Sequence, residues 1–516
     1  MHKRCTIMCP GIKCIRLRKK CEYTDWSESN TTASNAVFHT SVPRPHVDSR
    51  SHVKDYIAIT TNQHSSAEGP SRPFPLSFFL DTDFLTPLNA NALDFGSESS
   101  PIWRSALASL KHDHSEICLQ YLATVHMWLP MISKKRLIRD LESLDHGSAH
   151  VDTCLPLLLL CMGLCLNRIE YRPSISSLYA VATSLCSTAE TTGFVSIRLV
   201  QSLVLLAVYE LSNAIYPAAY LTIGRAARLG ILMGMHDRER AQQLFEDFET
   251  WTLREEQRRT WWAVFVLDRF VNIETRGMPF AAPEPCFEEL LPVNDEDWDS
   301  GTIVGSEHLY STTFSETMVL GSFATVCQSA HMLSKVAHHR AAKLTSDDAA
   351  HLLSEAHNLH TALSMLHSAL DKSEINGTSF NNSQSPSRLM ASALCTSSGL
   401  ILYNLYGCNE PTGSTVREPL ALEMQNICLR GIKDLAVSTA PKIAKIDTAC
   451  PFTAPCLYHA ATECAWFIRE DHDPKMYEAL REIVKGLQCL EIRWRLAGEY
   501  LNLLEQAGAM KLINRE

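Results

Sequence analysis

Long apolar runs are scarce in this sequence of 516 residues. The most apolar stretch, CLPLLLLCMGLCL (154–166), contains Pro156 and is shorter than the roughly 18–20 residues that cross a bilayer. The first residues, MHKRCTIMCPGIKC, carry charge but are not followed by the apolar segment that a signal peptide needs. The sequence therefore predicts a buried core helix at 154–166 and a soluble, intracellular protein with no membrane partner.

Signals for strands and for enzyme sites are also missing. No alternating apolar and polar pattern occurs, and the glycine-spaced GRAARLG (224–230) lacks both the Gly-Lys-Ser/Thr ending of a phosphate loop and a preceding strand. Neither Gly-x-Ser-x-Gly nor His-Glu-x-x-His is present, and the histidines of KHDHSE (111–116) have no second ligand cluster at telling spacing. We expect an all-α protein that is not an enzyme.

Acidic residues are absent from the first 21 positions, although the whole chain has a formal net charge of −10. A small basic head on an acidic body is expected when only the head meets a polyanion. Residues 25–100 are predicted to form a flexible linker, because polar residues and proline dominate most of it. Within that linker, 74–98 mixes aromatic and acidic residues, and it is expected either to pack onto the following domain or to bind a partner.

The remainder, 101–516, has the periodicity of one large helical domain. The strongest helical patterns span 199–211, 219–235 and 254–274, where apolar residues recur every three to four positions. Further helices are predicted at 321–343, 347–371, 388–406, 418–437, 453–470 and 474–508. No heptad run is evident, so a homodimer would have to form without a coiled coil.

Eighteen cysteines are spread along the chain. Those inside apolar runs, such as Cys161, Cys165, Cys186 and Cys464, are predicted to be buried free thiols rather than disulfides. Four others precede the linker with the spacing C-x3-C-x4-C-x6-C, namely Cys5, Cys9, Cys14 and Cys21. Four thiolates are a donor set for zinc, which predicts a zinc-binding segment at 1–24.

The basic residues between and beside these cysteines suit phosphate contacts, and we assign DNA binding to Lys13, Arg16, Arg18, Lys19 and Lys20. The stretch CIRLRKKCEYT (14–24) resembles the closing part of the fungal zinc binuclear cluster, in which six cysteines bind two zinc ions. In that comparison the first two cysteines would precede Met1. Either the cluster is completed upstream, or the module is reduced and the protein works without reading DNA itself; a basic N-terminus with incidental cysteines is the third alternative.

A longer resemblance lies in the core motif 219–299. AYLTIGRAARLGILMGMHDR (219–238) and LREEQRRTWWAVFVLDRF (253–270) are similar to the middle homology region of fungal zinc-cluster transcription factors. The matching positions in the second stretch include Arg258, Arg259, Trp261, Trp262, Asp268 and Arg269. We interpret these residues as core architecture: the helix is apolar on all sides, so Asp268 and Arg269 must be paired, with Arg258, Arg259 or Arg276 as candidate partners.

The resemblance implies a nuclear, pathway-specific transcriptional regulator of a metabolic or secondary-metabolite gene set. It further implies zinc as cofactor, double-stranded DNA with CGG-type half-sites as partner, and contacts with the transcription machinery or co-regulators. Two alternatives remain. The first is a co-regulator without sequence-specific DNA binding, and the second is an effector-binding helical protein of unrelated role.

Overall fold

The structure is a computed structural model that describes residues 77–80, 113–145, 154–166, 176–245, 250–273, 275, 278–286, 288–309, 320–375, 385–407, 419–444 and 450–513. Within these ranges the regular elements are helices, apart from one isolated bridge between Leu290 and His308. The predicted all-α class is therefore confirmed for the described part of the chain. The segment 1–24 and most of the predicted linker lie outside these ranges, and the domain boundaries stay predictions.

The first group of helices packs around α9, whose residues are all buried. The group comprises α5 (His114–Ala123), α6 (Lys134–Asp145), α7 (Leu155–Leu166), α8 (Ser177–Thr191), α9 (Ile197–Ser212), α10 (Ala218–Leu232) and α11 (Trp251–Val271). Helix α7 packs against α5, α8 and α9, and it is buried along nearly its whole length because its residues are apolar on every face. The prediction of a core helix at 154–166 is thus confirmed.

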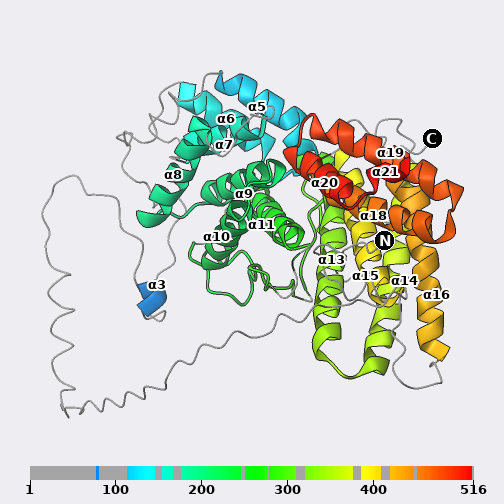
Figure 1. Cartoon of the computed structure of the whole chain (residues 1–516). Helices are drawn as coiled ribbons and strands as arrows, with labels where there is room; N and C mark the ends of the chain where they lie inside the picture. The colour runs from blue at the N-terminus through cyan, green and yellow to red at the C-terminus, as the bar shows by residue number, and fades with distance from the viewer. Residues whose placement is uncertain are drawn as a thin grey trace, which may run out of the picture. The chain divides into compact units, whose positions relative to one another are not determined.

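The second group continues from the short α12 (Asp295–Ser300). Figure 1 shows α13, α14, α15 and α16 side by side, and their mutual contacts agree with that view. The bounds are α13 (Ser322–Thr345), α14 (Ala349–Ile375), α15 (Pro386–Tyr406), α16 (Pro419–Asp434), a π-helical turn (Leu435–Thr439), α17 (Ala440–Ala444), α18 (Thr453–Asp471), α19 (Pro474–Glu491), α20 (Arg495–Gln506) and α21 (Met510–Ile513). Helix α15 is long and apolar enough to cross a membrane by length and composition alone, but 83% of its most apolar window is buried against its neighbours, as in a core helix.

One predicted helix is wrong in its extent. The pattern at 474–508 predicts a single helix, whereas the chain turns between α19 and α20. The backbone N–H of Trp494 donates to the carbonyl of Leu490 at 2.8 Å, and α20 then packs back onto α18 and α19. Burial of the Trp494 side chain and of the apolar face of α20 favours this turn, although no glycine or proline marks it.

The cysteines of the helical domain are mostly interior. Of the thiols that the structure describes, only Cys286 and Cys489 are not buried. Burial raises the pKa of Cys165, Cys456 and Cys464 to about 12. The prediction that Cys161, Cys165, Cys186 and Cys464 are buried free thiols is confirmed.

Helix α11 is the element on which both groups meet. It contacts α9 and α10 of the first group and α13 of the second. Its N-cap is Thr250, whose side chain accepts a hydrogen bond from the N–H of Leu253 at 3.4 Å. The run from Trp261 to Val271 is buried throughout, which confirms the expectation of an all-round buried helix.

The approach of α10 to α11 depends on a glycine. A Cβ atom added at Gly230 would lie 2.8 Å from Cζ3 of Trp261, closer than side-chain carbons approach one another. Six residues earlier on the same helix, a Cβ at Gly224 would meet only the Cβ of Ala281, at 4.0 Å. The absence of a side chain at Gly230 therefore lets the Trp261 ring lie directly against α10.

We expect Gly230→Ala to lower the free energy of unfolding by about 1–3 kcal/mol, because the added methyl group overpacks the Trp261 ring. Gly224→Ala is the matched control on α10, and it should be neutral or stabilising by up to about 1 kcal/mol because alanine favours the helix. Chemical denaturation of both variants measures the difference. Equal stability of the two variants would contradict the close α10–α11 contact.

Candidate functional site

The predicted metal and DNA-binding residues cannot be placed. Cys5, Cys9, Cys14, Cys21, Lys13, Arg16, Arg18, Lys19 and Lys20 all lie outside the described residues. Among the described residues there is no group of three or more His, Cys, Asp or Glu side chains that could hold a metal ion. The candidate site that the structure does show is built on α11, where the predicted motif residues Arg258, Arg259, Trp261, Trp262, Asp268 and Arg269 all lie.

The first charge network surrounds Arg259, which is fully buried together with Glu255 one turn earlier. The Arg259 Nε lies 2.9 Å from Oε1 of Glu255, and its Nη1 lies 2.6 Å from Oδ1 of Asp295. Backbone groups complete the network: Val293 accepts from Arg259 Nη2 at 2.7 Å and donates to Glu255 at 2.9 Å. Opposite charges and hydrogen bonds together offset the cost of removing this arginine from water, and they hold the segment before α12 against α11.

Aromatic contacts strengthen the same junction. The Arg259 guanidinium lies 4.1 Å from the ring centre of Trp298 on α12, a cation–π distance. The Nε1 of Trp262 donates to the carbonyl of Leu290 at 2.9 Å. The tryptophans therefore fix the irregular segment between Leu290 and α12, in addition to filling the core.

The neighbouring Glu256 bonds to α6, α9 and the residue before α6 rather than to the segment before α12. It is 1% exposed, and it accepts from the backbone N–H of Ser133 at 3.1 Å and from the side-chain amide of Gln201 at 3.2 Å. It also pairs with Arg136 at the start of α6. A single turn of α11 is thus bonded to α6, α9 and the segment before α12.

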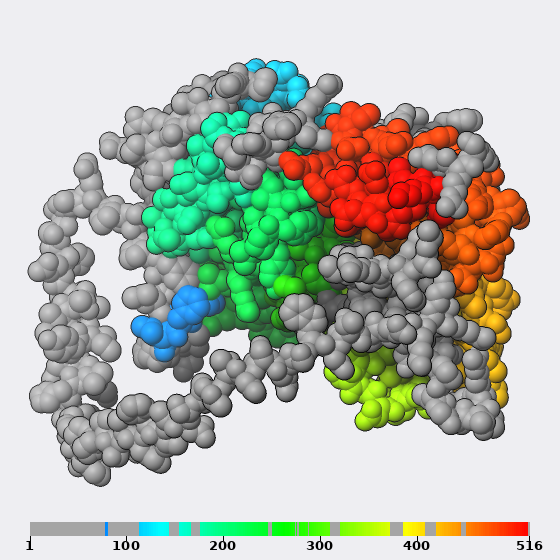
Figure 2. All heavy atoms as spheres, in the orientation of Figure 1, coloured from blue at the N-terminus to red at the C-terminus, as the bar shows by residue number. Residues whose placement is uncertain are grey.

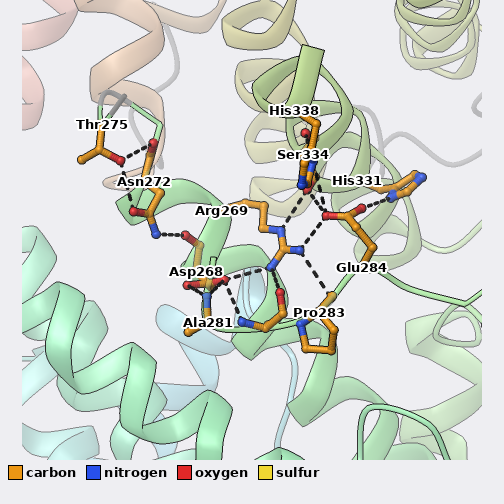
Figure 3. Close-up of polar contacts among 11 residues, drawn as sticks. Asp268, Arg269, Asn272, Thr275, Ala281, Pro283, Glu284, His331, Ser334 and His338 are labelled. Atoms are coloured by element: carbon orange, nitrogen blue, oxygen red, sulfur yellow. Dashed lines mark hydrogen bonds and ion pairs between the residues drawn. The ribbon is translucent and has the colours of Figure 1, made fainter. Parts of the chain in front are cut away.

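A second network lies at the other end of α11 (Figure 3). The Asp268 carboxylate accepts from the N–H groups of Ala281 at 3.0 Å and Ala282 at 3.1 Å, and from Nη1 of Arg269 at 2.9 Å. The Asn272 amide donates to the backbone carbonyl of Asp268 at 2.8 Å. Burial raises the pKa of Asp268, and the Arg269 charge and the two N–H bonds oppose that rise.

Arg269 has a protein acceptor for each of its five N–H groups. Its Nε donates to Ser334 at 3.1 Å and its Nη2 to Glu284 at 2.8 Å, while Phe265 and Phe280 lie 3.9 and 4.3 Å from the guanidinium carbon by their ring centres. The remaining acceptors are the Asp268 carboxylate and the carbonyls of Ala282 and Pro283. A guanidinium bonded in this way is a structural centre and has no donor left for a ligand.

Two histidines of α13 border this network through Glu284. The Nδ1 atoms of His331 and His338 lie 3.6 and 3.7 Å from its carboxylate oxygens. Burial alone would raise the pKa of Glu284, but the Arg269 charge and the bond from Ser334 outweigh it and lower the pKa. Burial lowers the pKa of His331 to about 4, so this imidazole is neutral at physiological pH.

A hollow of about 410 Å³ lies beside the network. Its walls come from the segment 278–284 and from α13, and they include Arg269, Phe280, Glu284 and His338. Arg269 borders this hollow, but each of its N–H groups is already bonded to a protein acceptor. We therefore interpret Asp268 and Arg269 as architecture rather than as ligand-binding groups.

The expectation that Asp268 and Arg269 are paired is confirmed, but the candidate partners were wrong where the structure describes them. Arg258 and Arg259 lie at the other end of the helix, where both bond to Glu255. Arg276 lies outside the described residues. Sequence reasoning missed Glu284 and Ser334, because they are distant in sequence and occur in no pattern that points to Arg269.

The described residues thus form an all-α domain whose central helix is held by buried, hydrogen-bonded charges. A family model described as the fungal specific transcription factor domain matches residues 119–395, more than half of the sequence. The chain belongs to this family. It is accordingly a fungal transcription factor and not an enzyme.

Curated relatives agree with this assignment. The chain is 37% identical over 187 residues to Transcription factor BOA15 of Botryotinia fuckeliana, a match that covers 36% of this chain and 98% of that protein. It is 24% identical over 410 residues to Tropolone cluster transcription factor tropK of Talaromyces stipitatus (75% and 70% coverage), and 28% identical over 176 residues to the Ascochitine biosynthesis cluster transcriptional regulator of Didymella fabae (31% and 30%). No solved structure matches the chain.

Replacing Arg269 with methionine should lower the free energy of unfolding by about 3–5 kcal/mol, because Asp268 and Glu284 would lose their cation while Asp268 stays buried. Arg430→Met, at an exposed position of α16, is the control and should change stability by less than about 0.5 kcal/mol. Equal midpoints of chemical denaturation for the two variants would overturn the structural role of Arg269.

Stability should also depend on pH through His331. In the unfolded state His331 takes up a proton below about pH 6.5, whereas in the folded state it does so only below about pH 4. Its contribution to the free energy of unfolding is therefore fully present above pH 6.5 and is lost as the pH falls to 4. The full loss amounts to about 3 kcal/mol. His331→Gln should remove this part of the pH dependence, whereas His351→Gln at an exposed site should preserve it. Unfolding curves measured between these pH values test the slope, and an unchanged slope in His331→Gln would count against the assignment.

Proposed function

We propose that the protein is a pathway-specific nuclear factor that controls a secondary-metabolite gene set. The observation that carries the proposal is the family match together with the names of the relatives, which are regulators of a tropolone cluster, an ascochitine cluster and pigment biosynthesis. The helical domain supplies the contacts with co-regulators or the transcription machinery.

We further propose that DNA is bound through the cysteine-rich segment 1–24. Cys5, Cys9, Cys14 and Cys21 supply four thiolates, the donor set of one tetrahedral zinc ion, which would organise a segment too short to have its own core. Lys13, Arg16, Arg18, Lys19 and Lys20 would then contact phosphates, and CGG-type half-sites are the expected targets.

The alternative is a co-regulator that acts through its helical domain alone. The spacing of the four cysteines favours it, because that spacing departs from the six-cysteine pattern of the two-zinc cluster. This alternative requires no stoichiometric zinc and no preference between duplexes.

The test is a titration of the full chain against CGG-containing and scrambled duplexes, with and without zinc, at two salt concentrations. A zinc-dependent preference for the CGG duplex that is lost in the Cys14→Ser/Cys21→Ser variant supports the proposal. Cys489→Ser, at an exposed position of α19, is the matched control. Equal binding to both duplexes, unaffected by zinc, would favour the co-regulator.

The phosphate contacts make a separate prediction. Replacing Arg16, Arg18, Lys19 and Lys20 with glutamine should weaken binding to both duplexes and reduce the slope of log K against log salt by up to about 0.9 per lost contact. Replacing the exposed Arg139, Arg430 and Lys485 of the helical domain should leave the slope unchanged. If the two sets of substitutions change the slope equally, the contacts have been assigned to the wrong residues.

A further inference from the structure

A second, larger hollow lies on the opposite side of α10 from the Trp261 contact. It has a volume of about 930 Å³, and it opens between α10, the end of α8 and the turn at Phe194. Its walls are mainly apolar, with Tyr220, Leu221, Leu229 and Leu232 contributed by α10. A concave apolar site of this size with few polar groups is the usual form of a small-molecule site.

One wall comes from the short helix α3 (Ser77–Leu80), within the predicted linker. Figures 1 and 2 show this helix in blue. Phe78 is half-buried and packs against the helical core. The rest of the aromatic stretch 74–98, beyond α3, lies outside the described residues, so its packing stays a prediction. The Phe78 ring lies edge-on to that of Phe79, with centroids 5.1 Å apart, and Phe79 lines the hollow although it is 70% exposed. Phe79 thus keeps most of its surface exposed at the hollow, where a flat apolar molecule can pack against it.

The charges of the walls do not cancel. Glu190 and Arg225 neutralise each other through a two-pronged pair, in which Nε and Nη2 of Arg225 donate at 3.0 and 2.8 Å. Arg228 is the other charged side chain of the lining; it is exposed at the rim, and it forms no ion pair with any residue that the structure describes. One cation is therefore left over at an otherwise apolar site.

We propose that this hollow binds a small organic anion that contains aromatic rings, with its rings against Phe78, Phe79 and α10 and its acidic group on Arg228. The aromatic walls select the ring system, and the unbalanced cation selects the negative charge. Such a molecule would bridge α3 and α10 and so stabilise the packing of Ser77–Leu80 on the helical domain. A regulatory consequence of this packing rests on the proposed function; the binding itself does not.

The probes are anilinonaphthalene sulfonate, an aromatic anion, and N-phenylnaphthylamine, which has the same rings without the charge. Fluorescence titration of the folded full chain should give saturable binding of both probes, and a higher affinity for the anion. Arg228→Gln should weaken binding of the anionic probe by about tenfold, the loss expected for one charge-assisted hydrogen bond. Binding of the neutral probe should stay unchanged. Phe78→Ala/Phe79→Ala should weaken both.

Leu80→Ala is the control, because Leu80 belongs to the same short helix but is 79% exposed and does not line the hollow. This variant should bind both probes as the parent does. Absence of saturable binding, or equal effects of Arg228→Gln on both probes, would overturn the proposal; so would loss of binding in Leu80→Ala. Since no DNA is present, these outcomes are independent of the test of DNA binding.

Discussion

Two buried arginines, Arg259 and Arg269, impose the constraint on which the rest of this domain depends. Each guanidinium lies in the core, where an unpaired charge would cost several kcal/mol, on the order of what stabilises a whole domain. Each must therefore keep its carboxylates and carbonyls, and most of those acceptors lie outside α11. The irregular segments 278–286 and 288–294 are held in place because they supply acceptors of this kind, not because they have regular structure of their own.

The two networks give α11 a different role from that of the purely apolar helices. Helices α7 and α15 pack through apolar surface, which is non-directional and tolerates volume-conserving exchange. Helix α11 bonds through directed groups at both of its ends, and it therefore fixes the positions of α6, α9, α12 and α13 relative to itself. A junction specified in this way is poorly suited to large rearrangement. Fewer directed bonds surround the hollow beside α10, where Phe78 of α3 packs against the core.

How far the sequence predicts this structure depends on whether the information is local. The all-α class, the buried helix at 154–166 and the burial around Trp261 follow from composition and periodicity within one segment. The sequence also required a partner for Arg269, since burial of its helix was evident. The identity of that partner was not predictable, because Glu284 and Ser334 reach Arg269 only through the path of the chain after α11. The break before Trp494 was missed for a related reason: packing onto α18 and α19, rather than a local breaker, sets it.

The burial of the thiols separates the helical domain from the metal chemistry proposed for the first 24 residues. Zinc binds thiolates, and thiols with a pKa near 12, such as Cys165, Cys456 and Cys464, supply almost none at neutral pH. Among the described residues only Cys286 and Cys489 are accessible alternatives. The thiols of the helical domain are therefore weak competitors for zinc. Zinc bound as proposed at the first 24 residues would therefore respond to zinc supply independently of the described helices, whose fold does not rest on a metal ion.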